Sequence, residues 1–181
     1  VLVYNRAITA AEAASNFDNV ASMFGHYGIR GYVTSGLIYN FDVGNTNSYI
    51  GSGSTWENLA GSTDISLSNN TYNKWGRSFT INSNSNNSMS GTSLTGGSFS
   101  IEVWFNRTGN SHSATEGHLF TQDSGNYNGN GWQLKVTDSD STVKFVYWTT
   151  STRSSAVTIA SSTAISNASW YQVVVTYDGT Y

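Results

Sequence analysis

The chain has 181 residues, a formal net charge of −3 and no cysteine, and Ser, Thr, Asn and Gly fill close to half of its positions. The missing cysteines exclude a disulfide framework and a thiolate metal site, and the few basic residues argue against nucleic acid as a partner. No apolar run is long enough to insert across a membrane, while an aromatic content of 14% is too high for a disordered chain.

The first residues predict a strand followed by a helix. Val1–Tyr4 is a β-branched and aromatic run of the kind found in strands. Thr9 and Glu12 have the spacing of a capping box, in which each side chain satisfies a free backbone donor at a helix start. We therefore predict a helix over Thr9–Phe24, with an apolar stripe that should pack on a sheet: Ala13, Phe17, Val20 and Phe24.

Residues 26–35 have no clear period and are interpreted as a linker, and after them the apolar residues alternate with a period of two. This alternation predicts strands at Leu37–Phe41, Phe79–Ile81, Phe99–Phe105, His118–Gln122, Trp132–Thr137, Val143–Trp148, Ala156–Ala160 and Trp170–Tyr177. Short strands with one apolar face, separated by turns rich in Gly, Asn and Ser, predict an all-β protein with two packed sheets.

Several blocks of the sequence resemble a known family. They are Gly36–Asp42, Asn47–Tyr49, Gly51–Trp56, Asn58–Gly61, Phe99–Phe105 and Trp170–Gly179. Together they resemble the concanavalin A-like jelly-roll domains of the laminin-G or pentraxin type. The blocks up to Gly61 are similar to a variant common in virion structural proteins of tailed bacteriophages. The resemblance implies an all-β fold: an antiparallel two-sheet jelly-roll sandwich, preceded here by one strand and one α-helix.

The resemblance also implies a domain organisation. Val1–Gly25 is similar to the last strand and trailing helix of such a domain, so we assign residues 1–25 to a preceding laminin-G-like unit and residues 26–35 to a linker. Residues 36–181 then form a laminin-G-like sandwich without its final strands. Val1–Tyr4 could take the place of one of them only by circular permutation, and completing an earlier domain or a neighbouring subunit is the favoured interpretation. An open sheet edge invites pairing with another chain, which predicts self-association.

Glycoside hydrolases share this sandwich, and their chemistry needs two carboxylates about 5–10 Å apart. The predicted strand that carries Glu102 presents Ser100 and Trp104 on the same side and no second acid. Asp138 and Asp140 are two residues apart, but they lie in a segment typical of a turn. We therefore predict that the protein is not an enzyme.

Many laminin-G and pentraxin relatives bind calcium, so the resemblance makes calcium a candidate ligand, although no cofactor is required. Calcium takes about six to eight oxygen ligands, and four aspartates lie near predicted loops: Asp42, Asp123, Asp138 and Asp140. The alternative interpretation is that these are solvated turn residues. Asp42 is expected to tie down the loop that follows it through Asx-type hydrogen bonds.

Tryptophans supply the candidates for carbohydrate binding. Trp104, Trp148 and Trp170 fall opposite the main apolar faces of their predicted strands, where a sugar ring could stack on an accessible indole. The alternative is that these side chains pack against a neighbouring domain or subunit.

The combined interpretation is a non-enzymatic structural and recognition protein of a tailed-phage virion, in a fibre, appendage or capsid decoration at the virion surface. Its expected partners are other virion proteins or further copies of itself, and a cell-surface glycan. Two alternatives stay open: a lectin-like module of a bacterial surface adhesin, and a polysaccharide-active enzyme.

Overall fold

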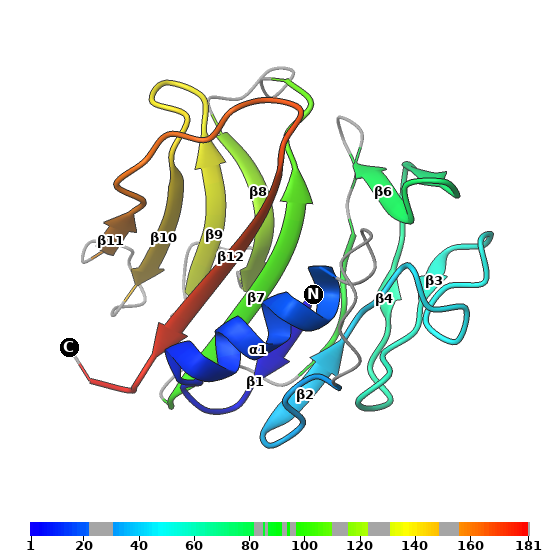
Figure 1. Ribbon diagram of the computed structural model, residues 1–181, viewed down its shortest axis with the longest axis horizontal. Helices are drawn as coiled ribbons and strands as arrows, with labels where there is room; N and C mark the ends of the chain where they lie inside the picture. The colour runs from blue at the N-terminus through cyan, green and yellow to red at the C-terminus, as the bar shows by residue number, and fades with distance from the viewer. Residues whose placement is uncertain are drawn as a thin grey trace. The chain divides into compact units, whose positions relative to one another are not determined.

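The structure is a computed structural model of the chain (Figure 1). It describes residues 1–21, 31–81, 85, 87–91, 94, 97–109, 116–122, 131–148 and 156–180, with the side chains of the helix described as far as Asn19. The residues group into two compact units. The first comprises Val1–Thr92, Gly96–Glu102 and Val174–Tyr181, and the second comprises Ser93–Thr95 and Val103–Val173.

One four-stranded sheet has the order β12-β7-β1-β2. Within it, β1 pairs antiparallel with both neighbours, so that Val3 lies opposite Tyr39 on one side and opposite Ile101 on the other. All three residues of β1 are buried, as expected for an apolar strand between two others. The strands are β12 (Trp170–Tyr177), β7 (Phe99–Asn106), β1 (Leu2–Tyr4) and β2 (Leu37–Asn40).

The pairing of β1 differs from the assignment of residues 1–25 to a preceding unit. Leu2–Tyr4 lies between β2 and β7 of its own chain (Figure 1). The physical reason is that β2 and β7 each have backbone groups along one edge that need partners, and β1 supplies both sets. The end of the predicted linker belongs to the same region, because Tyr32 and Val33 pack against the cluster of Leu2, Tyr4 and Ile8.

A second four-stranded sheet has the order β11-β10-β9-β8, and its neighbours pair antiparallel. Buried side chains face each other across its central pair: Leu134 lies opposite Phe145, and Trp132 lies opposite Tyr147. Apolar residues at every second position of the sequence are the pattern that predicted these strands. Their bounds are β8 (Glu116–Gln122), β9 (Gly131–Thr137), β10 (Val143–Trp148) and β11 (Ala156–Ala160).

Two short antiparallel pairs complete the strands of the described chain. They are β3 (Thr55–Trp56) with β4 (Ile65–Ser66), and β5 (Asn70–Asn73) with β6 (Ser78–Ile81). The predicted fold class, an all-β antiparallel protein with one helix after its first strand, is confirmed. Within the described ranges, no helix is long and apolar enough to cross a membrane.

Helix α1 spans Ala10–Ala21 and has the predicted capping box at its start. The backbone N–H of Thr9 donates to Glu12 Oε2 at 2.8 Å, and the N–H of Glu12 donates to Thr9 Oγ1 at 3.2 Å. Arg6 strengthens this arrangement through an ion pair with Glu12 at 2.6 Å. Together these contacts satisfy free donors at the start of the helix.

The predicted apolar stripe of α1 is right at Ala13, which packs against the buried cluster of β1, and wrong at Phe17, whose side chain is 43% exposed. The fully buried position of the helix is Asn16. It faces the sheet because its amide finds hydrogen-bond partners there, as described below. Phe24 and the side chain of Val20 lie outside the described residues.

Candidate functional site

The β5–β6 hairpin of the first unit is anchored by packed rings. Tyr72 lies opposite Phe79, and the ring of Tyr49 contacts both, at centroid distances of 5.1 and 4.8 Å. Phe79 also meets Trp56 edge-on at 5.1 Å. Because edge-to-face contacts are a favoured geometry for aromatic pairs, these rings fix one face of the hairpin.

Polar contacts hold the start of β5. Asn70 and Asn87 exchange hydrogen bonds through their side-chain amides, and Asn87 Oδ1 also accepts from the backbone N–H of Ser68 at 2.9 Å. Ser85 Oγ donates to the carbonyl of Asn69 at 2.8 Å. The base of the hairpin is therefore braced by amide and hydroxyl groups as well as by rings.

The hairpin reverses direction over residues 74–77. The N–H of Gly76 donates to Asn73 Oδ1 at 3.0 Å, which closes an Asx-type turn. A Cβ at position 76 would lie 2.8 Å from Asn73 Nδ2, so a larger residue there would displace the Asn73 side chain that closes the turn. Arg77 follows with φ of 44°, in the left-handed region that costs a non-glycine residue about 1 kcal/mol.

The tip of this hairpin carries Trp75, which is 93% exposed. A large apolar side chain exposed to solvent is informative about binding, because burying an apolar group normally lowers the free energy of the protein. Lys74 and Arg77 flank it, are themselves exposed, and form no ion pair with any residue that the structure describes. We call Lys74, Trp75 and Arg77 the hairpin tip. The indole face can pack on the apolar face of a ring. The two cationic side chains beside it can donate hydrogen bonds to oxygens on that ring.

The three tryptophans selected from the sequence lie in the second unit. Trp148 is 8% exposed, Trp104 is partly buried, and Trp170 is 41% exposed. Phe105 on β7 stacks on Tyr171 of the neighbouring strand β12 at 5.8 Å. Because side chains alternate along a strand, Trp104 and Trp170 share the opposite face, whereas Trp148 belongs to the other sheet.

The aspartates Asp138 and Asp140 lie beside cations of the protein. Asp138 Oδ1 is 2.9 Å from Arg107 Nη2, and Asp140 Oδ2 is 2.7 Å from Lys144 Nζ. Lys144, with the hydroxyl groups of Thr137 and Thr142, holds the pKa of Asp140 well below its ordinary value. In this arrangement both carboxylates are paired with cations of the protein and stabilise the β9–β10 turn.

Asp42 closes the loop after β2 as expected, because its Oδ1 accepts from the N–H of Gly44 at 2.9 Å. The other oxygen, Oδ2, lies 3.4 Å from the hydroxyl of Tyr32. Asp123 lies outside the described residues. The described part of the chain holds no group of three or more His, Asp or Glu side chains able to bind a metal. Calcium binding stays a prediction.

Glu102 lies beneath helix α1 rather than at a surface. It is 1% exposed, and its Oε2 accepts from Asn16 Nδ2 at 2.8 Å. The same amide group donates to the hydroxyl of Tyr4 at 2.9 Å, and the Oδ1 of Asn16 accepts from the N–H of Val33 at 3.1 Å. Burial raises the pKa of Tyr4 to about 12, so this hydroxyl stays protonated. We call Tyr4, Asn16 and Glu102 the buried polar cluster.

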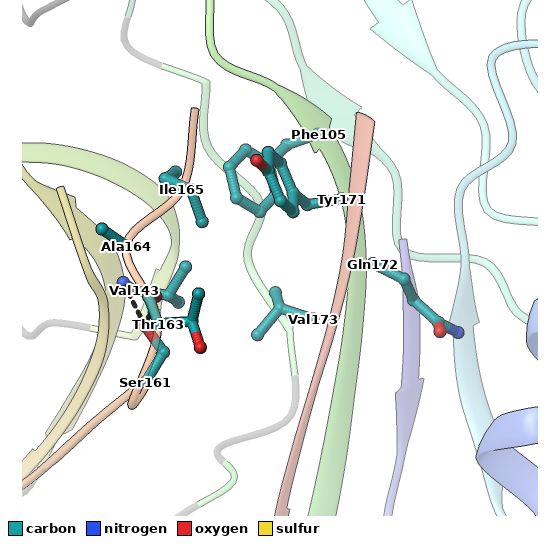
Figure 2. A pocket seen from close by; sticks show the side chains of 9 residues that line it. All are labelled: Phe105, Val143, Ser161, Thr163, Ala164, Ile165, Tyr171, Gln172 and Val173. Carbon is teal, nitrogen blue, oxygen red and sulfur yellow. Dashed lines mark hydrogen bonds between the residues drawn. The ribbon is translucent and has the colours of Figure 1, made fainter. Parts of the chain in front are cut away.

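A cavity of about 220 Å³ lies in the second unit. Figure 2 shows Phe105, Tyr171, Val173 and Ile165 around it, while Gln172 points away. Ser161 is engaged inside the protein, since its Oγ donates to Thr163 O and accepts from the N–H of Val143. No charged side chain lines the space. An apolar cavity of this kind offers little to a polar ligand such as a sugar.

A sequence model of the concanavalin A-like lectin/glucanases superfamily matches residues 80–181. The match covers more than half of the chain, and the chain belongs to this family. No curated protein and no solved structure matches the chain significantly. Trp75 precedes the matched segment, so its importance is argued from geometry alone.

Sequence reasoning missed Trp75 because a hairpin tip has no period of apolar residues. The available signal was local: Asn73 and Gly76 are turn residues, and Trp75 lies between them. Lys74 precedes the tryptophan and Arg77 follows Gly76, so a basic residue stands on either side. A tryptophan inside a turn cannot be part of a strand's apolar face, so it must either fold back on the protein or face solvent.

Proposed function

We propose that this protein is a non-enzymatic, lectin-like module that binds glycans through Trp75. The family supplies the class, and the observation that carries the proposal is the 93% exposure of Trp75 at the end of a braced hairpin. One face of a pyranose ring presents C–H groups, which pack on an indole, while its hydroxyl groups need hydrogen-bond partners. Asn73 and Ser78, which pair at the end of the hairpin, are polar residues next to the tip.

The positions of the carboxylates support a non-catalytic role. Glu102 is covered by α1, and Asp138 and Asp140 are held by Arg107 and Lys144. Glycoside hydrolysis needs one carboxyl group as acid and a second as base or nucleophile, both in contact with the sugar. A buried acid and two ion-paired ones are poorly suited to this work.

The finer proposal is that the module is displayed at the surface of a tailed-phage virion, in a fibre, appendage or capsid decoration. It rests on the resemblance of Gly36–Gly61 to virion proteins. Repetition along a particle would add avidity to weak single contacts. β11 is an edge strand of its sheet, and it carries the exposed apolar residues Val157 and Ile159. Such an edge favours association with other virion proteins or with further copies of the chain.

Binding to a glycan array tests the proposal. The wild-type protein should bind a defined set of glycans without calcium, and Trp75→Ala should lower the affinity at least tenfold, as for a central aromatic contact. Trp170→Ala is the matched control, because it removes a less exposed tryptophan and should change the affinity less than twofold.

Two results would overturn this function. Equal binding by wild-type protein and Trp75→Ala would remove the hairpin tip from the site. New reducing ends on incubation with a bound polysaccharide would show that the protein is an enzyme.

A further inference from the structure

We infer that the hairpin tip selects acidic glycans, an inference that rests on the proposed function and names the class of its ligand. The observation behind it concerns the basic side chains. The structure describes six of the eight lysines and arginines, and four of these six form ion pairs: Arg6, Arg107, Lys135 and Lys144. The remaining two, Lys74 and Arg77, both belong to the hairpin tip.

The four paired cations have structural roles. Their N–O distances to carboxylates lie between 2.6 and 2.9 Å, and their side chains are at most 29% exposed. Lys74 and Arg77, by contrast, are exposed, and the segment Asn70–Ile81 contains no acidic residue. In a chain of net charge −3, this segment therefore holds a local excess of positive charge. Unpaired cations that flank an exposed indole complement an anionic ligand.

The chemistry of the two side chains defines the ligand further. Arg77 presents a planar set of donors that matches a carboxylate or a sulfate, and Lys74 presents a compact charge. The indole of Trp75 lies between them in the sequence and accepts the apolar face of a sugar ring. A glycan whose rings carry carboxylate or sulfate groups meets both requirements, whereas a neutral glycan meets only the second.

An anionic membrane is the competing partner for a basic, aromatic tip. Interfacial binding needs a broad apolar face along with its cations. Here the tip has one large apolar side chain, and Ile81, which is 60% exposed, pairs with Asn70 at the opposite end of the hairpin. The observations therefore favour the glycan, and vesicles serve as one arm of the test.

The test compares polymers that share a backbone and differ in charge. Titration calorimetry would compare the affinity for polygalacturonate with that for its methyl ester, and the affinity for dextran sulfate with that for dextran. We expect wild-type protein to bind an acidic polymer at least tenfold more tightly than its neutral counterpart, with the preference falling as salt rises. The double variant K74Q/R77Q should lose about tenfold in affinity for the acidic polymer, because it loses two charged contacts.

A matched control separates local charge from net charge. K135Q/K144Q removes the same number of cations from ion pairs elsewhere, and it should keep the preference for the acidic polymer. Thermal unfolding of each variant shows that it is folded. Loss of the preference in K135Q/K144Q as well would overturn the inference.

The remaining outcomes show whether the acidic preference alone fails or whether glycan binding fails with it. Equal binding of acidic and neutral polymers, with Trp75→Ala weak on both, overturns the acidic preference and leaves glycan binding intact. Binding of none of the four polymers, together with a blank glycan array, overturns both. Tighter binding of phosphatidylserine vesicles or of oligothymidine, lost in K74Q/R77Q, overturns the glycan as ligand.

Discussion

The buried polar cluster and the hairpin tip reverse the usual placement of polar and apolar groups. Beneath α1, an amide, a phenol and a carboxyl group are withdrawn from water, with Asn16 fully buried and Glu102 1% exposed. At the hairpin tip, an indole is 93% exposed between two cations. Both belong to the first unit, and both depart from the rule that apolar groups are buried and charged groups solvated.

The difference lies in the partners. In the buried polar cluster, Asn16 uses its side-chain amide for three hydrogen bonds, to Tyr4, Glu102 and Val33. Burial of such groups is tolerated only when they are paired. At the hairpin tip, the described residues offer no carboxylate to Lys74 or Arg77. Paired polar groups inside the protein hold the helix on the sheet. The cations of the hairpin tip are exposed to solvent, where we propose that a ligand binds.

The largest expected effect comes from breaking the buried polar cluster. Asn16→Leu removes all three hydrogen bonds and leaves the carboxyl group of Glu102 without one of its donors. We expect the free energy of unfolding in urea to fall by about 3 kcal/mol. Asp18→Leu places the same side chain at an exposed position of α1 and should change it by less than about 0.5 kcal/mol. Unchanged stability in Asn16→Leu would mean that apolar packing replaces the cluster.

A smaller effect on stability should distinguish Arg107, which forms an ion pair, from Arg77, which forms none with a described residue. Arg107 is bound to Asp138 at 2.9 Å and to Ser141 Oγ at 2.9 Å, and its side chain is 8% exposed. Arg107→Gln should lower the free energy of unfolding by about 2 kcal/mol, because it leaves Asp138 without its cation. Arg77→Gln should change it by less than about 0.5 kcal/mol. Equal destabilisation by the two substitutions would show that Arg77 has a structural role.

The smallest effect concerns the helix cap and pH. Hydrogen bonds from Arg6 and Thr9 lower the pKa of Glu12 to about 2, from an ordinary value of 4.5. A carboxyl group with a lowered pKa stabilises the folded state fully above its unfolded pKa, and this contribution is lost as the pH falls from 4.5 toward 2. Glu12→Gln should therefore reduce the loss of stability between pH 6 and pH 3, measured by urea unfolding. An identical loss in both proteins would contradict this role.

The regular parts of the fold could be predicted because their residues alternate. The predicted strands Val143–Trp148, Ala156–Ala160 and Trp170–Tyr177 agree with β10, β11 and β12 at both ends. β5 could not be predicted, since Asn70–Asn73 is polar apart from one tyrosine and depends on contacts with distant rings. Local periodicity thus suffices where burial follows the strand, and fails where partners come from elsewhere in the chain.

The candidate site was less predictable for a related reason. The sequence indicated tryptophans on strands, of which Trp148 is buried at 8% exposure, and it missed Trp75 in a turn. It placed Glu102 on a polar face, but helix α1 covers that face through Asn16. Accessibility is a property of the folded chain, and it depends on which distant element covers a given side chain.

The central claim is that Trp75 receives the ligand, and the indole N–H signals of the six tryptophans test it most directly. In a ¹⁵N-labelled sample titrated with oligogalacturonate, the signal that disappears in Trp75→Phe identifies Trp75. We predict that this signal shifts most and that the signal of the buried Trp148 does not move. A largest shift at Trp104 or Trp170, with Trp75 unmoved, would contradict the account.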